Sequence, residues 1–127
     1  MLYSVVTDKD LETACNDLQE AVARHKFGVL HVHNLTATMA KKGVEFGHEC
    51  RIFEVCNPHQ AKKVLEQNMD ISTALPCRIS VFAEKGQVKL STIKPMMLLQ
   101  MFGEEGLAGV AEEVEKTIVA IMDEAAK

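Results

Sequence analysis

Cys56, His59 and Cys77 form the first group of side chains that could carry chemistry. Cys56 directly precedes Asn57-Pro58, a strong helix-start signal, so its sulfur is expected near the positive end of a helix dipole. A thiol in that position can have a lowered pKa, with His59 as a proton partner. Cys77 would be the resolving thiol if the two strand ends meet. Alternatively, both cysteines are small apolar side chains packed in a core.

His31, His33, His48 and Cys50 form the second group. Each pair is separated by two residues, so the alternation of a strand would place its members on one face. If the two strands pair through the 34–47 connection, four ligands could converge on zinc, copper or haem iron. In the alternative interpretation, His31 and His33 are half-exposed strand residues that bond to a neighbour or line a polar cleft. Spacing alone does not fix the register of the strands.

The rest of the sequence argues against several classes of function. There is no Ser/His/Asp order, P-loop or paired dinucleotide glycines, which leaves no assembled catalytic motif and weighs against an enzyme. The net charge of -4 opposes binding to nucleic acid. No export signal opens the chain and no apolar run reaches the ~18 residues of a membrane helix, so we expect a cytoplasmic protein with no membrane partner. Its four cysteines lack CxxC spacing and are expected to be free thiols.

Periodicity and turn signals predict the elements that must position these groups. Short apolar runs predict strands over 2–6, 29–34, 49–56, 76–84 and 87–93, with Lys85-Gly86 as a tight hairpin turn. Apolar residues at intervals of three and four predict helices over 11–25 and from Pro58 to about Asn68. Gly28 is expected to end the first helix. Pro95 opens a short helix, and an amphipathic helix over 107–125 closes the chain. The 34–47 connection is predicted to be a long, mobile loop.

The order and shortness of the connections predict an α+β domain over residues 1–127, with a mostly antiparallel sheet of about five strands and helices packed on one face. The strand over 49–56 is mixed on both faces. One face carries Cys50, Ile52, Glu54 and Cys56, whereas the other carries Glu49, Arg51, Phe53 and Val55. We therefore expect both faces to be partly covered, the second one by a partner chain or a ligand.

Three segments resemble a known family. They are Glu49 to Pro58, Leu75 to Val81, and the hairpin that ends at Pro95. Together they resemble the bacterial and archaeal family called domain of unknown function 302, from about Leu2 to Phe102. The resemblance implies a curved antiparallel sheet backed by helices, commonly in a homodimer. It brings no established activity, and the final helix lies beyond it.

Three functional hypotheses follow. The first is a cytoplasmic homodimeric module that binds a small ligand or a partner protein in a cleft beneath the 34–47 loop. The second is a thiol-based redox or sulfur-carrier protein that uses Cys56. The third is a metal- or haem-binding protein that uses His31, His33, His48 and Cys50, and only this hypothesis names a cofactor.

Overall fold

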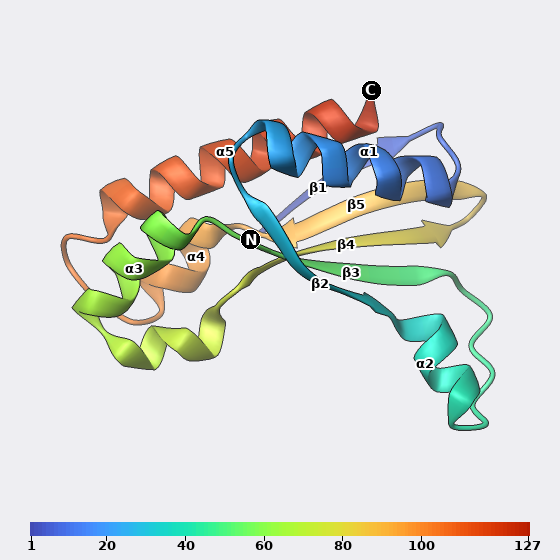
Figure 1. The fold of residues 1–127 in the computed structure, drawn as a ribbon, viewed down its shortest axis with the longest axis horizontal. Helices are drawn as coiled ribbons and strands as arrows, with labels where there is room; N and C mark the ends of the chain where they lie inside the picture. The colour runs from blue at the N-terminus through green and yellow to red at the C-terminus, as the bar shows by residue number, and fades with distance from the viewer.

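Five strands form one antiparallel sheet in the computed structural model, which describes residues 1–127 (Figure 1). The spatial order is β1-β5-β4-β3-β2, so the first strand lies beside the last and β2 forms the opposite edge. The predicted α+β fold with a curved antiparallel sheet is confirmed. The strands are β1 (Leu2–Thr7), β2 (Gly28–Asn34), β3 (Cys50–Cys56), β4 (Cys77–Glu84) and β5 (Gln87–Ile93).

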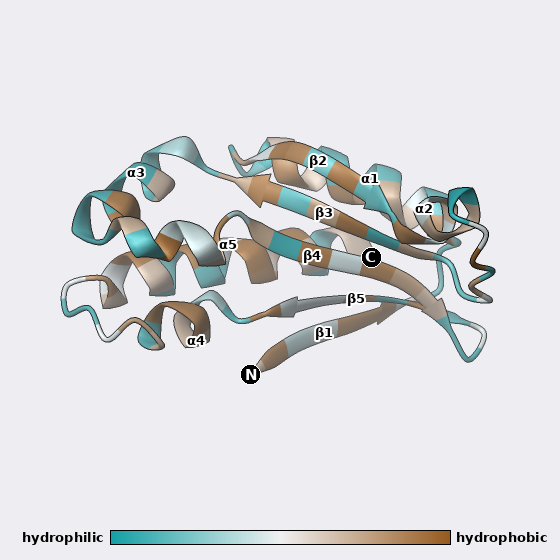
Figure 2. Ribbon diagram, turned by 90° about the horizontal axis from the view of Figure 1, so that it is seen from below, coloured by the Kyte–Doolittle hydropathy of each residue, from teal (hydrophilic) through white to brown (hydrophobic).

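Two long helices, α1 and α5, lie side by side on one face of this sheet (Figure 1). The shorter helices α3 and α4 gather at one end of the sheet, and α2 lies at the other end. The view in Figure 2 shows the opposite face of the sheet, which no helix covers. The helices are α1 (Leu11–Arg24), α2 (Leu35–Lys41), α3 (Pro58–Gln67), α4 (Pro95–Gln100) and α5 (Ala108–Ala126), with a 3₁₀ helix, η1 (Met69–Ala74), after α3.

The main core fills the space between the sheet and the two long helices. Alternate strand residues such as Phe53, Ile79 and Leu90 are fully buried there. They meet Leu18 of α1 and Ile118 of α5, which are also fully buried. Each such side chain stabilises the fold by roughly 1.5–3 kcal/mol relative to exposure. The periodicity that predicted α1 and the closing helix therefore reflects this core.

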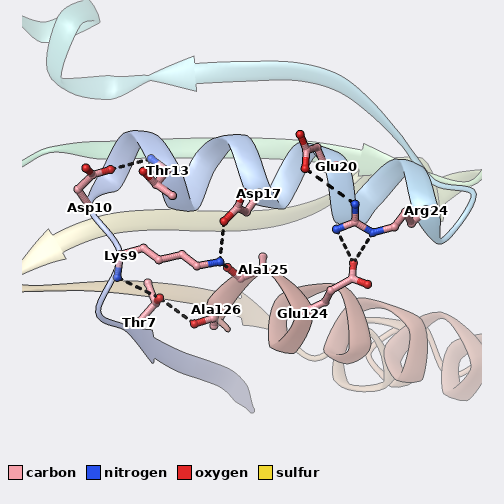
Figure 3. A network of polar contacts seen from close by, with 10 residues as sticks. All are labelled: Thr7, Lys9, Asp10, Thr13, Asp17, Glu20, Arg24, Glu124, Ala125 and Ala126. Atoms are coloured by element: carbon pink, nitrogen blue, oxygen red, sulfur yellow. Dashed lines mark hydrogen bonds and ion pairs between the residues drawn. The ribbon is translucent and has the colours of Figure 1, made fainter.

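A polar clamp ties α1, α5 and the end of β1 together (Figure 3). The Lys9 ammonium donates to Asp17 at 2.6 Å and to the Ala125 carbonyl at 2.9 Å. The Thr7 hydroxyl donates to the Ala126 carbonyl at 2.8 Å. These donors satisfy carbonyls in the last turn of α5, which have no partner within the helix. At the other end of α1, Arg24 Nη2 lies 3.1 Å from Glu124 Oε2.

Two predicted local signals are confirmed. Lys85 and Gly86 have φ angles of 54° and 77°, as a two-residue hairpin turn between β4 and β5 requires. The Asn57 side chain accepts from the backbone N–H groups of His59 and Gln60, and Pro58 is the first residue of α3.

Two other predictions are wrong. Helix α1 ends at Arg24, and Lys26, with φ of 64°, takes the left-handed position expected of a glycine. The Phe27 N–H donates to the Val22 carbonyl, and burial of the Phe27 side chain holds this helix end, so Gly28 is left to begin β2. The 34–47 connection is not simply a loop, because it contains α2, which is capped by the Asn34 side chain.

Candidate functional site

A mainly apolar pocket opens where β3 and β4 meet α3, η1, α4 and α5. Its volume is about 510 Å³ with the open mouth included, and eleven of its fifteen lining residues are hydrophobic. Apolar concavities of this kind are the usual form of small-molecule sites. Its walls include Phe27, Val55, Val64, Leu99 and Val114.

The pocket lies at the seam between two hydrophobic clusters. Phe27, Val55 and Val114 belong to the main core between the sheet and the long helices. Val64 and Leu99 belong to a smaller cluster, which α3, η1, α4 and the start of α5 build. The pocket forms because neither cluster fills the space between them.

Gln60 brings one polar group to this apolar site. The Asn57 cap fixes the first turn of α3, and Gln60 in that turn lines the pocket. Its Oε1 is buried and has no hydrogen-bond partner. An unpaired buried acceptor costs roughly 1–3 kcal/mol, which a ligand with a donor group would recover. Sequence reasoning missed Gln60, because burial of a polar atom on a short helix leaves no mark in the sequence pattern.

Cys56 and Cys77 both line the pocket. The strand ends do meet, since Val55 pairs with Cys77. However, burial raises the pKa of the Cys56 thiol, and burial together with the charge of Cys56 raises the pKa of Cys77 to about 11. The predicted lowered pKa at Cys56 is therefore wrong. Desolvation of the thiol is the cause of the raised pKa at Cys56, and the Asn57 side chain already occupies N–H groups of the first turn of α3. His59 is exposed and does not line the pocket.

The structure does not bring the predicted metal ligands together. The rings of His31 and His33 lie 4.4 Å apart, but His31 faces Glu54 and His33 faces Ile52 across the β2–β3 ladder. His48 precedes β3 and lies beside Phe46, with ring centroids 5.4 Å apart.

Cys50 lies one residue past the last β2–β3 pair, Asn34 with Arg51, and its sulfur is 3.9 Å from the Ser80 hydroxyl of β4. No group of three His, Cys, Asp or Glu side chains is placed to hold a metal ion. The predicted convergence of His31, His33, His48 and Cys50 is therefore wrong, because His48 lies outside the strands and Cys50 lies past the end of the β2–β3 ladder.

The uncovered face of the sheet is the second feature of interest. A cross-strand row runs through Ser4, Ser91, Ser80, Ile52 and His33. The Ser4 and Ser91 hydroxyls lie 2.8 Å apart, between the edge strand β1 and its neighbour β5. Small polar side chains therefore cross the open face from the edge strand β1 to the central strand β4.

The side of β3 that carries Arg51, Phe53 and Val55 faces the helices of the same chain, where the sequence predicted a partner chain or a ligand. Phe53 and Val55 are fully buried there, and Arg51 forms an ion pair with Glu12 of α1. The Arg51 Nε is buried without a partner. The charged residues of this face therefore lie against α1 and do not extend the pocket.

None of the three principal pockets is lined by a residue of the 34–47 segment, where the sequence placed a cleft. All three are lined in part by residues of α4. None of the helices combines the length and the apolar character needed to cross a membrane.

Comparisons with known proteins agree with this architecture. A family model described as "Domain of unknown function DUF302" matches residues 3–125, which include α5 as well as the segments that carried the resemblance. The chain is similar to the crystal structure of an uncharacterized conserved protein DUF302 from Bacillus stearothermophilus, with 32% identity and a TM-score of 0.93. That similarity covers 98% of this chain and 97% of the other. No protein with a curated description matches. The chain belongs to the DUF302 family.

Proposed function

We propose that the protein is a cytoplasmic, homodimeric module that binds a small, mainly apolar ligand in the pocket at the seam of the two clusters. The observation that carries the proposal is the apolar wall with one unpaired buried acceptor, Gln60 Oε1. A ligand with an apolar body and one hydrogen-bond donor would fit both features. The four free thiols suit a reducing compartment.

The pocket supports binding better than catalysis. Its lining contains no Asp, Glu, His, Lys or Arg, so no side chain with a pKa near neutrality is available for acid–base chemistry. The two thiols that line it are held neutral by burial at physiological pH. Thiol chemistry is therefore the weaker hypothesis for this site.

Octanol is a suitable first probe, because it combines an apolar chain with one donor. We expect saturable shifts of the backbone amide signals of β3, α3 and η1 when octanol is titrated into the protein and followed by NMR. Ala61→Phe should abolish these shifts, because Ala61 lines the pocket and the larger ring would fill it. Ala120→Phe, on the exposed side of α5, is the matched control. Non-saturable shifts, or equal binding by both variants, would refute the proposed pocket.

Gln60→Met separates the role of the acceptor from that of the fold. Replacing an unpaired buried oxygen by a side chain of similar shape should leave the free energy of unfolding unchanged or raise it by about 1 kcal/mol. Octanol should nevertheless bind more weakly to this variant. A loss of stability together with unchanged octanol affinity would show that Gln60 has no role in binding.

A second copy of the chain is the proposed occupant of the open sheet face. Five strands of six to eight residues make a face of roughly 24 Å by 20 Å. Its projected area is within a factor of two of the ~800 Å² per partner of a standard interface. Exposed apolar residues at its margins, Leu2, Val6 and Ile93, would be covered by such a partner.

The charges on this face favour a second copy over other partners. Cross-strand alternation places two basic residues, Arg78 and Lys89, and two acidic residues, Glu54 and Glu84, on it. A face with balanced charges can pair with itself about a two-fold axis, whereas it offers no net attraction to nucleic acid or to an anionic surface.

Light scattering tests the dimer directly. We expect a dimer mass at micromolar concentration, and a monomer mass for Ser91→Arg, which puts a bulky charge between Ser4 and Ser80 in the serine row of the face. Ala120→Arg, on the helical side, should remain dimeric. A monomeric wild-type protein, or a Ser91→Arg variant that stays dimeric, would remove the open face as the interface.

A further inference from the structure

Residues 35–47, which we call the arm, contain α2 and its return towards β3. The arm projects past the ends of β2 and β3, on the side of the sheet opposite to α1 and α5 (Figure 1). Its base is fastened, because the Thr36 hydroxyl donates to the His48 carbonyl at 2.6 Å and accepts from the Cys50 N–H at 3.1 Å. The open sheet face therefore has a structured projection at one end.

The arm lacks a partner within the chain. None of the residues of α2 is buried, and Val44 and Phe46 in the return segment are 53% and 39% exposed. An isolated helix of seven residues is marginal in water, because most helices are stabilised by tertiary packing. The arm therefore offers apolar side chains to a second molecule.

The opposite end of the sheet offers an apolar surface with a hollow in it. A second pocket is lined there by residues of η1, β4, β5 and α4, and its volume is about 580 Å³ with the open mouth included. Five of its nine lining residues are hydrophobic. Met69, Met97 and Met101 at this end are 68%, 40% and 80% exposed. Exposed apolar residues gathered around a hollow are typical of a protein-binding surface.

The two ends also differ in charge. The arm has two lysines and one glutamate, whereas η1 with residues 94–107 has three acidic residues and one lysine. These residues are Lys41, Lys42 and Glu45 in the arm, and Asp70, Lys94, Glu104 and Glu105 at the other end. Arg78, which also lines the second pocket, already pairs with Glu54. A basic arm at one end and an acidic surface at the other are complementary.

Two copies can pair face to face about a two-fold axis in two ways. An axis parallel to the strands would bring arm against arm and place like charges together, which is unfavourable. An axis across the strands would bring each arm to the opposite end of its partner, where the charge is complementary and apolar residues are exposed.

We propose that the arm of each copy docks on the η1–α4 end of a second copy, with Val44 and Phe46 covering the second pocket. This inference rests on the proposed dimer. The sheet face alone has a projected area of about 480 Å² per copy, below the ~800 Å² per partner of a standard interface. Helix α2 is about 10 Å long and about 10 Å wide, so each arm covers about 100 Å², and each copy takes part in two such contacts. The arms would therefore bring the interface close to the standard size.

Charge reversal tests this arrangement, because it can be undone by mixing two variants. Lys41→Glu with Lys42→Glu reverses the arm, and Asp70→Lys with Glu105→Lys reverses the other end. All four side chains are exposed. In analytical ultracentrifugation each double variant should raise the dissociation constant of the dimer about tenfold, because like charges then meet in both contacts. An equimolar mixture of the two double variants should restore the wild-type constant, because every arm then meets an end of opposite charge.

Lys116→Glu with Lys127→Glu is the matched control, since it changes the net charge as the arm variant does but lies on α5 and at its end. This control should keep the wild-type dissociation constant. A wild-type constant for either of the two test variants, or a mixture that stays as weak as they are, would overturn the docked arm and leave the dimer through the open face standing. A monomeric wild-type protein would refute the proposed dimer itself, and this inference with it.

Discussion

Lys9 joins three elements through one ammonium group, and its replacement gives a sharp test of the clamp in Figure 3. The side chain follows β1, pairs with Asp17 of α1 at 2.6 Å, and donates to the Ala125 carbonyl in the last turn of α5 at 2.9 Å. Lys9→Met removes the ammonium group but keeps an unbranched apolar stem that can still cover the same surface. The variant therefore isolates the polar contribution.

The expected loss follows from the exposure of the two partners. A hydrogen bond to a charged group contributes about 1.5–3 kcal/mol when buried, whereas a fully exposed ion pair contributes about 0–1 kcal/mol. The Lys9 and Asp17 side chains are 23% and 34% exposed, which places the pair between these limits. With the bond to the helix end added, we expect Lys9→Met to lower the free energy of unfolding by about 2 kcal/mol. At a urea dependence of about 2 kcal/mol/M, the midpoint should fall by about 1 M.

Urea unfolding followed by far-UV circular dichroism measures this shift. All variants are compared at the same protein concentration, because the unfolding midpoint of a dimer depends on protein concentration. Lys116→Met is the control, since Lys116 is exposed on α5 and should change stability by less than about 0.5 kcal/mol. In about 1 M salt the contribution of Asp17 should be screened while the bond to the carbonyl persists, so the difference should shrink without vanishing. A Lys9→Met midpoint equal to that of the control would refute the clamp as a source of stability.

Three further predictions concern ionisation and the hairpin. Tyr3 is the only tyrosine and there is no tryptophan, so the absorbance of tyrosinate reports the ionisation of Tyr3 alone. The hydrogen bond from Tyr3 to Asp123 raises the pKa of Tyr3 above 10.0. Asp123→Asn should return the titration midpoint toward 10.0, and an unchanged midpoint would contradict this cause. Burial raises the pKa of Cys77 from 9.0 to about 11, so the stability that its neutral thiol contributes below pH 9.0 should be lost as the pH rises toward about 11. Cys77→Ala should flatten this decline in urea midpoints measured across that window, and an equally steep decline would exclude Cys77 as its source. Lys85→Asn should raise the free energy of unfolding by roughly 0.5–1 kcal/mol, because asparagine tolerates the positive φ at this turn better than lysine. Calorimetric unfolding measures the change, and a variant no more stable than the wild-type protein would contradict the prediction.

The parts of the fold that could be predicted are those with local signals. Asn57-Pro58 predicted the start of α3 because a side-chain acceptor and a residue without an N–H are favoured there whatever the tertiary context. Lys85-Gly86 predicted the hairpin because only a turn with positive φ joins adjacent strands in two residues. The strand bounds were predicted from turn-forming and helix-capping residues of the same kind.

Helix α2 escaped prediction for a physical reason. None of its residues is buried, so it has no apolar stripe whose period could be read from the sequence. Its one local signal is the Asn34 side chain, which accepts from the Ala37 N–H at 3.0 Å. Asparagine before a mixed segment is too common to indicate a helix by itself.

The predicted metal group failed because it depended on register. The sequence correctly placed His31 and His33 on one strand and Cys50 on the next. The register shift between Val29 and His31 and the β2–β3 ladder then decided which residues face the histidines, and neither is local information. The predicted lowered pKa of Cys56 failed for a different reason: the helix start is a local signal, whereas the burial that raises the pKa depends on the tertiary fold.

Helix α5 explains how the pocket is completed beside the predicted Cys56 and Cys77. Ala111 belongs to the smaller cluster and Val114 to the main core, while Val110 packs against both, so α5 spans the seam and forms one wall of the pocket. The pocket is therefore assembled from segments far apart in the sequence, from Phe27 to Val114, each of which looks like ordinary core. A ligand in this seam would contact both clusters, so binding should raise the apparent stability of the whole chain in proportion to the logarithm of ligand concentration above its dissociation constant. Under the proposed function, occupancy of the pocket and the packing of the two clusters against each other would be one coupled equilibrium.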